Sequence, residues 1–206
     1  SGLATVYGLT AHPTATRDVK SSRPGNPSGT GNTSGTAKYD ALTPTFGTPT
    51  RTADGYTVSI TNYDAAYTWA GSATASGSVS INAGTGLVTV TGAAANTESV
   101  TTVTTTRAGY VGGTASVSGT SLAAARTPTF AAPTRTAGGF TVQITNFDAA
   151  WTWAGTATAS GTVTVNGSGL ATITGVANNT SSTATITATR TGYVTGSATS
   201  TAVSLP

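Results

Sequence analysis

The chain has 206 residues, of which 37% are hydrophobic and 7% are charged, and its formal net charge is +3 at pH 7. Charged residues make up about 25% of ordinary soluble domains, so the expected surface is neutral and rich in hydroxyl groups. Disordered chains are poor in β-branched and aromatic residues, whereas Val, Ile, Thr, Tyr and Trp recur along this chain. The composition therefore predicts a folded β protein.

The composition also excludes several classes of partner and site. There is no cysteine, which excludes disulfides, thiolate zinc sites and cysteine nucleophiles. The nine Lys and Arg residues are spread over the whole chain. We expect no nucleic-acid partner, because such partners are bound by basic patches. No window approaches the roughly 18 consecutive apolar residues of a membrane helix, so we expect no membrane span.

Residues 1–42 differ in composition from the rest and are predicted to form an N-terminal arm. Alternation over residues 2–11 predicts one strand through Leu3, Val6 and Leu9. Residues 21–36 contain Ser, Gly, Asn and Pro but no apolar residue. That composition is typical of a flexible linker.

A strand followed by a long tether is suited to docking on the sheet edge of another subunit. Basic residues accompany the predicted strand in the same arm. The sequence thus predicts an attachment segment that binds protein subunits of a larger assembly. Its candidate residues are Leu3, Val6, Leu9, Arg17, Lys20 and Arg23.

The remainder of the chain consists of two copies of one sequence. Thr43–Phe46 returns at Thr127–Phe130, an offset of 84 residues (130 − 46). The stretch from Gly55 returns from Gly139 with conservative changes, and the second copy is one residue shorter after Asn166. Each copy spans about 80 residues, which is enough for one small domain. We predict a first repeat over residues 43–122 and a second over residues 127–205.

Within each repeat the hydrophobic period is two, which is typical of half-buried strands. Tyr56, Val58 and Ile60 alternate with hydroxylated residues, and turn signals rich in Gly, Asn and Ser separate such stretches. The pattern predicts about seven short strands per repeat, a number typical of immunoglobulin-like sandwiches. The predicted fold class is all-β, with two tandem β-sandwiches behind an extended N-terminal segment.

One stretch carries a family likeness. Leu87–Thr97, with the later Val103 and Tyr110, resembles the second half of fibronectin type III modules, and Leu170–Thr180 is its equivalent. More broadly, both repeats resemble the tandem Thr-rich immunoglobulin-like or fibronectin type III-like arrays of bacterial surface proteins and phage structural proteins. The resemblance implies spacers, stalks or adhesive units, and it does not identify a ligand.

Two features depart from the fibronectin pattern. The tyrosine expected near the start of the penultimate strand is missing around Ser99 and Ser181. The tryptophans that both copies share, Trp69 and Trp153, fall in the third predicted strand, as in immunoglobulin domains. The resemblance therefore supports a sandwich without fixing its topology.

Candidate catalytic groups are few. His12 is the only histidine, and it lies in the predicted arm. Of the acidic residues, only Asp64 and Asp148 are equivalent in the two repeats, whereas a glycosidase needs two facing carboxylates and a calcium site needs several. We predict no catalytic residue, no cofactor and no metal site. Asp64 and Asp148 are interpreted as parts of side-chain-capped turns.

The aromatic residues allow two interpretations. Tyr67 and Trp69 share parity, as do Trp151 and Trp153, so each pair points to one side of its strand. The first interpretation is one large buried aromatic per repeat. The alternative is an exposed platform for stacking sugars, with Tyr67 and Trp151 as the candidate glycan contacts.

Together these observations predict a non-enzymatic structural and adhesive surface protein. It would display tandem immunoglobulin-like modules on a phage virion or a bacterial cell surface, outside the cell, and attach through its N-terminal arm. The alternative is a carbohydrate-binding protein that recognises host surface glycans through exposed aromatics. Assembly into a homo-oligomer is left open.

Overall fold

The computed structural model describes residues 5, 7 and 14–206. The predicted strand through Leu3, Val6 and Leu9, and also His12, lie outside the described residues. The described part contains sixteen strands and no helix. It accordingly has no helix with the length and apolar character needed to cross a membrane.

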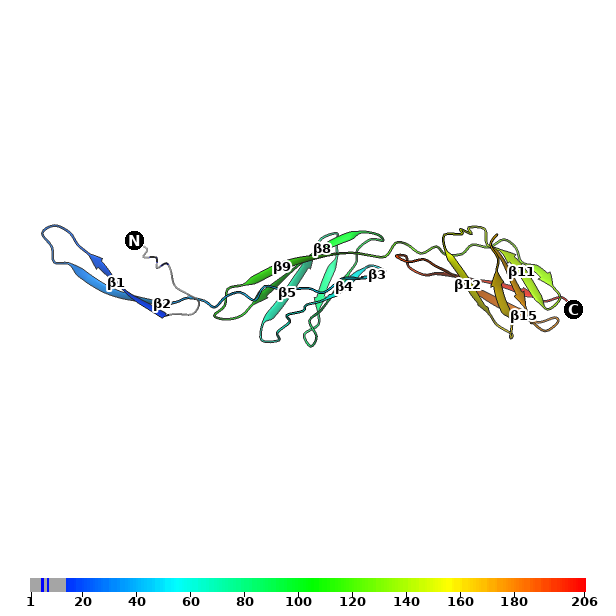
Figure 1. Cartoon of the computed structure of the whole chain (residues 1–206), viewed down its shortest axis with the longest axis horizontal. Helices are drawn as coiled ribbons and strands as arrows, with labels where there is room; N and C mark the ends of the chain where they lie inside the picture. The colour runs from blue at the N-terminus through cyan, green and yellow to red at the C-terminus, as the bar shows by residue number, and fades with distance from the viewer. Residues whose placement is uncertain (1–4, 6, 8–13) are drawn as a thin grey trace. The chain divides into compact units, whose positions relative to one another are not determined.

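The arm contains a β-hairpin. β1 (Thr14–Ser21) and β2 (Gly29–Thr36) pair antiparallel along their whole length, from Thr14 opposite Thr36 to Ser21 opposite Gly29 (Figure 1). They form a two-stranded sheet of their own. The linker predicted for residues 21–36 is thus replaced over Gly29–Thr36 by a strand. Backbone pairing needs no apolar side chain, so a composition without a core does not exclude a hairpin.

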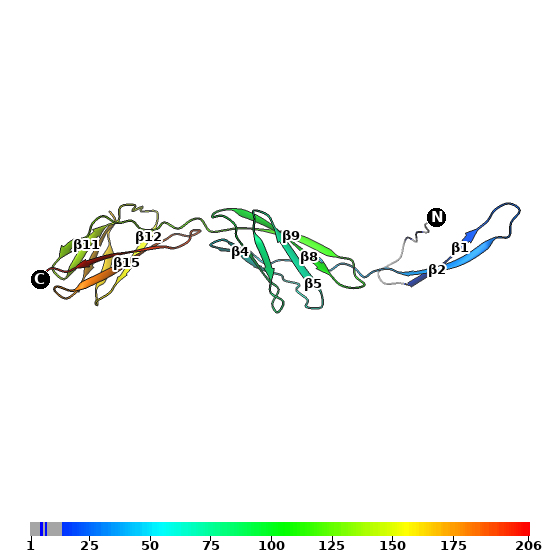
Figure 2. The ribbon, with the colours of Figure 1, turned by 180° about the vertical axis from the view of Figure 1, so that it is seen from behind.

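Each repeat forms two sheets, as Figures 1 and 2 show. In the first repeat, the four-stranded sheet has the spatial order β3 (Thr50–Thr52), β4 (Gly55–Ser59), β7 (Leu87–Thr91), β6 (Ser78–Ile81). The three-stranded sheet has the order β5 (Thr68–Ala73), β8 (Glu98–Thr106), β9 (Gly113–Thr120). In the second repeat, the four-stranded sheet has the order β10 (Thr134–Thr136), β11 (Gly139–Gln143), β14 (Leu170–Thr174), β13 (Thr162–Val165). The three-stranded sheet has the order β12 (Thr152–Ala157), β15 (Ser181–Thr189), β16 (Gly196–Val203).

These strand orders settle the topology. Lettered A to G along the chain, the seven strands of each repeat lie as A-B-E-D in one sheet and C-F-G in the other. That is the arrangement of the constant-type immunoglobulin domain. The prediction of two tandem β-sandwiches is confirmed, and the fibronectin-like alternative gives way to the immunoglobulin order.

The core of each sandwich comes from alternate residues of facing strands. In the second repeat the buried set is Phe140, Val142, Ile144, Ala171, Ile173, Val176, Ala184 and Ile186. In the first repeat it includes Val58, Ile60, Val88, Val90 and Val103. Full burial of a Val, Ile or Phe side chain contributes about 1.5–3 kcal/mol. The large aromatics at the centre are Tyr56 on β4 and Phe140 on β11, and Trp69 and Trp153 are half-buried.

By their internal contacts the residues group into two compact units, 1–49 with 57–90 and 100–118, and 50–56 with 91–99 and 119–206. This division runs through the first repeat, so the predicted bounds of 43–122 and 127–205 stay a prediction. The backbone suggests that the paired segments begin slightly earlier. Tyr39 N–H donates to the Gly109 carbonyl, and Ala123, its equivalent, donates to Gly192.

A close backbone approach fixes the first segment of each repeat. A Cβ on Gly113, the first residue of β9, would overlap the carbonyl oxygen of Leu42. Its equivalent Gly196 meets the carbonyl oxygen of Arg126 in the same way. In the first repeat Thr105 Oγ1 also donates to the Leu42 carbonyl over 2.6 Å. The segment that precedes each sandwich is therefore held against the β8–β9 or β15–β16 hairpin.

We expect Gly113→Ala and Gly196→Ala each to lower the free energy of unfolding by at least about 2 kcal/mol, since a methyl group must push a backbone carbonyl away. Gly112→Ala is the matched control, because a Cβ there would lie an ordinary 3.5 Å from its nearest atom. Urea unfolding of the three variants measures the difference. Equal stability of Gly112→Ala and Gly113→Ala would contradict the close approach.

A buried serine directly follows the last strand of each sandwich. Ser121 is fully buried, donates through Oγ to the Ala94 carbonyl and accepts from Thr97 N–H over 3.1 Å. Ser204 is equally buried; it donates to Ala177 and accepts from Thr180. The single hydroxyl thus satisfies a carbonyl and an N–H of the loop before β8 or β15.

Replacing either serine by alanine should cost about 1 kcal/mol or more of stability, because two part-buried hydrogen bonds are lost, each worth about 0.5–1.5 kcal/mol. Ser121→Ala and Ser204→Ala should differ little, since their contacts are the same. Chemical denaturation provides the measurement, with the exposed Ser78→Ala as control, for which a change within about 0.5 kcal/mol is expected. A neutral result for both buried serines would refute this role.

Candidate functional site

Each repeat carries aromatic rings and arginines beside the loop that joins its last two strands. The first cluster consists of Tyr39, Tyr67, Arg107 and Tyr110, and the second cluster of Arg126, Trp151, Arg190 and Tyr193. In each cluster one residue comes from the segment before the sandwich and one from the turn before its third strand. The other two come from the loop between its last two strands.

Side-chain-capped turns position the middle of each cluster. In the first repeat Asp64 Oδ1 accepts the Ala66 N–H over 2.8 Å, and the Asp64 carbonyl accepts Trp69 Nε1–H over 2.9 Å. Asn62 Nδ2 donates to the Thr43 carbonyl over 2.7 Å. The second repeat reproduces these bonds around Asp148 and Asn146. The turns predicted at Asp64 and Asp148 are observed, and they set the position of Tyr67 and Trp151.

The first cluster is a stack of tyrosines under a cation. Tyr39 and Tyr110 stack with ring centroids 4.8 Å apart, and Tyr67 meets Tyr110 edge to face at 5.4 Å. The guanidinium carbon of Arg107 lies 5.2 Å from the Tyr67 centroid and 4.8 Å from that of Tyr110. Such geometry is favourable for cation–π attraction to both rings. Tyr39 is 37% exposed, and Tyr67 and Tyr110 are half-buried.

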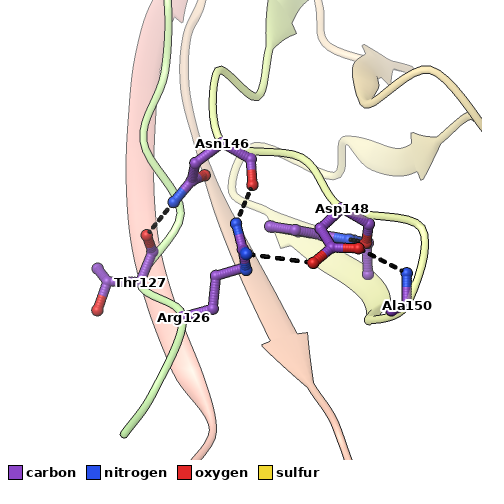
Figure 3. A network of polar contacts seen from close by, with 6 residues as sticks. Arg126, Thr127, Asn146, Asp148 and Ala150 are labelled. Atoms are coloured by element: carbon purple, nitrogen blue, oxygen red, sulfur yellow. Dashed lines mark hydrogen bonds and ion pairs between the residues drawn. The ribbon is translucent and has the colours of Figure 1, made fainter.

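In the second cluster Arg126 contacts both the capped turn and the tryptophan, and the first repeat has Leu42 at the equivalent place. Arg126 Nη2 lies 3.1 Å from Asp148 Oδ2, and Nη1 donates to the Asn146 carbonyl over 2.7 Å (Figure 3). The same guanidinium lies 5.7 Å from the centre of Trp151, which is 8% exposed. On another side Trp151 meets Tyr193 edge to face at 4.8 Å.

Open space accompanies the first cluster. A surface pocket of about 310 Å³ is lined by Lys38, Thr68, Thr106, Arg107, Ala108, Tyr110 and Gly112. A second pocket of about 250 Å³ is lined by Tyr63, Ala65, Tyr67, Thr68, Trp69, Ile81 and Ala83. Thr68 lines both. The first pocket presents hydroxyl groups and two cations to solvent, and the second presents aromatic rings.

The structure separates the two glycan contacts predicted from sequence. Each ring has an arginine over it and a tyrosine at its edge, but Tyr67 is half-buried and lines a pocket, whereas Trp151 is only 8% exposed. Parity predicted the side of the strand on which each ring lies, but not the residue that covers it. Of the two predicted glycan contacts, Tyr67 is the one that lines a pocket.

Sequence reasoning missed Arg107 and Tyr110. A signal was present, because Arg107 and Arg190 open the same motif, Arg-x-Gly-Tyr-Val, at equivalent places in the two repeats. The contribution of Tyr39, far earlier in the chain, has no such local signal.

The predicted attachment residues divide into two groups. Arg17, Lys20 and Arg23 are exposed on or beside the hairpin. Leu3, Val6 and Leu9 lie outside the described residues. Within the described residues, no group of three or more His, Asp or Glu side chains is placed to hold a metal ion.

Neither a family model nor a curated protein matches this chain. Among solved structures it is similar to a chimeric titin Z1Z2 functionalized with a KLER exogenous peptide from decorin, with 15% identity and a TM-score of 0.32 over 79% of this chain and 95% of that one. It is similar to the titin domains Z1Z2 in complex with telethonin at 16% identity and a TM-score of 0.29, over 80% and 96%. Extracellular domains 3–5 of Drosophila OTK match at 11% identity and a TM-score of 0.24, over 62% of this chain and 45% of theirs.

Proposed function

We propose that this chain is a non-enzymatic structural and adhesive protein that displays two immunoglobulin-like modules on a virion or a bacterial cell surface. Its N-terminal arm is the attachment segment. The observation that carries the proposal is the β1–β2 hairpin, which forms a sheet without a hydrophobic core among the described residues.

The hairpin has the features of an element that needs a partner. Every residue of β2 is exposed, and Val19 on β1 is 46% exposed. A two-stranded hairpin by itself is at best marginally stable in water, and a third strand or a covering surface stabilises it. Among the described residues no further strand pairs with the outer edge of either one, so these edges can accept a strand through their backbone N–H and C=O groups. A strand from another subunit would complete the sheet by strand addition.

The charges of the arm indicate the kind of surface it meets. Arg17, Lys20 and Arg23 are exposed around the hairpin. Basic side chains at the rim of an interface favour partners with acidic surfaces and accelerate their association. An assembly subunit with an acidic sheet edge fits both the backbone and the charge of the arm.

Carbohydrate binding is the second candidate function, and one observation favours it. The pocket beside Tyr67 is lined by the aromatic residues Tyr63, Tyr67 and Trp69 together with the hydroxyl-bearing Thr68, and small-ligand sites likewise combine aromatic side chains with polar groups. This function would make the modules adhesive as well as structural, and it does not depend on the arm.

The attachment role can be tested in the source organism with tagged chains. We expect a chain that begins at Ala37 to fold normally but to fall by about tenfold or more in purified virions or envelopes, a factor that corresponds to about 1.4 kcal/mol of binding. A matched control replaces residues 14–36 by a Gly-Ser segment of equal length, which keeps the tether and removes the hairpin. Recovery of this control at the level of the intact chain would exclude the hairpin as the attachment element.

A further inference from the structure

We propose that the outer edge of β1 pairs with the β1 edge of a second copy of this chain, so that two arms join into one antiparallel sheet with the order β2-β1-β1-β2. A two-fold axis at Val19 relates the two copies. The inference deepens the proposed attachment role, and it rests on that role only in taking the hairpin as an element that needs a partner strand. It names a second copy as the partner at β1 and leaves the edge of β2 for the larger assembly.

Val19 has no side chain opposite it within its own hairpin. It is 46% exposed, and its partner on β2 is Gly31. A Cβ added to Gly31 would meet no atom within 4 Å, and the two residues line a surface pocket of about 470 Å³. Cross-strand side-chain pairs are the contacts that stabilise a sheet. Because β2 does not supply that contact, it has to come from a strand at the other edge of β1.

The outer edge of β1 is open to such a strand. In the described part of the chain β1 pairs with β2 alone. Its eight residues include no proline and no glycine, so the whole edge can join a backbone ladder. It does carry Arg17, Asp18 and Lys20, and charged residues on an edge strand normally prevent edge-to-edge pairing. A partner strand for β1 must therefore match this order of charges.

The charges of β1 match themselves in one register. When a two-fold axis relates two antiparallel strands, one residue lies opposite its own copy and the residues on either side of it exchange partners. Asp18 and Lys20 directly precede and follow Val19. An axis at Val19 therefore places the register position of Asp18 opposite that of Lys20 twice. Opposite charges at directly opposed positions stabilise an antiparallel pair.

The neighbouring registers are unfavourable. An axis at Arg17, Asp18 or Lys20 would place that residue opposite its own copy, and like charges directly opposite each other destabilise a sheet. With the axis at Val19, the remaining charged residue, Arg17, lies opposite Ser21. Val19 then lies opposite Val19 of the second copy, which provides the missing apolar neighbour. The charge order and the apolar contact thus specify the same register.

A second copy fits the edge of β1 better than it fits the edge of β2. Strand β2, Gly29–Thr36, has no charged residue, so its sequence does not favour one register of self-pairing over another. The overlap on β1 is Arg17–Ser21, which is a small contact, and we expect a dimer that depends on protein concentration. Attachment of many arms close together would strengthen it through a higher effective concentration.

A single cysteine tests the register, because the chain has no cysteine of its own. We expect the full chain with Val19→Cys to form a disulfide-linked dimer under mild oxidation. Directly opposite residues of antiparallel strands have Cβ atoms about 4.5–5.5 Å apart, which is close to the distance in a disulfide. Thr33→Cys, at an exposed position on β2, is the matched control. It should stay monomeric on a non-reducing gel, because the two β2 strands lie at opposite outer edges of the joined sheet.

Exchanging the charges tests the pairing independently. Asp18→Lys and Lys20→Asp should each weaken the dimer of the full chain about tenfold or more, a factor that corresponds to about 1.4 kcal/mol. Each change places like charges at opposed positions, and the double variant Asp18→Lys/Lys20→Asp should restore the dimer. Sedimentation equilibrium measures the dissociation constants. Both sandwiches should unfold at the same temperature in every variant, since the changed residues belong to neither sandwich.

The outcomes separate this inference from the attachment role. It is overturned if Val19→Cys crosslinks no faster than Thr33→Cys, or if the double variant does not recover the dimer. If the chain that begins at Ala37 is nevertheless lost from purified virions or envelopes, the attachment role stands and its partner is another protein. If Val19→Cys crosslinks while the shortened chain is recovered at the normal level, the arms pair with each other and the attachment role is wrong.

Discussion

The two clusters depend on one steric constraint, the approach of a backbone carbonyl to a glycine that has no side chain. Gly113 and Gly196 let the segment before each sandwich lie against the final hairpin. Tyr39 in the first repeat and Arg126 in the second enter their clusters from that segment. Any side chain at these glycines would displace the segment, and the rings would lose their neighbours even though the sandwich core is elsewhere.

The two clusters are built on the same turns and loops, and they differ at few residues. The capped turns and the Arg-x-Gly-Tyr-Val loops are the same in both repeats. Arg126 in place of Leu42 adds an ion pair with Asp148 and a cation over Trp151. Because the pair is partly exposed, its net contribution to stability is small, at most about 1 kcal/mol. Its larger effect is to bury the indole ring and so remove it from the surface.

The sequence predicted the features that depend on local pattern. The alternation through Val58 and Ile60 gave the strands, and the offset of 84 residues gave the tandem sandwiches. It did not predict the hairpin, because backbone pairing over Gly29–Thr36 leaves no trace in hydrophobicity. Nor did it predict the first cluster. Tyr39, Tyr67 and Arg107 are far apart along the chain, and only the sheet order and the glycine contact bring them together.

The likeness of the two repeats creates a hazard while the chain folds. β4 and β11 share three of five residues and differ by Tyr against Phe and Ser against Gln, so either could pair with the partner strands of the other. Such misassembly is a characteristic failure of tandem repeat proteins. The divergence at the clusters opposes it. If the segment with Asp148 and Trp151 were exchanged into the first repeat, Asp148 would find Leu42 instead of Arg126. Asp64 in the exchanged turn would meet Arg126 in its place, so the ion pair alone does not distinguish the two turns, and the difference that remains between them is the ring, Tyr67 or Trp151.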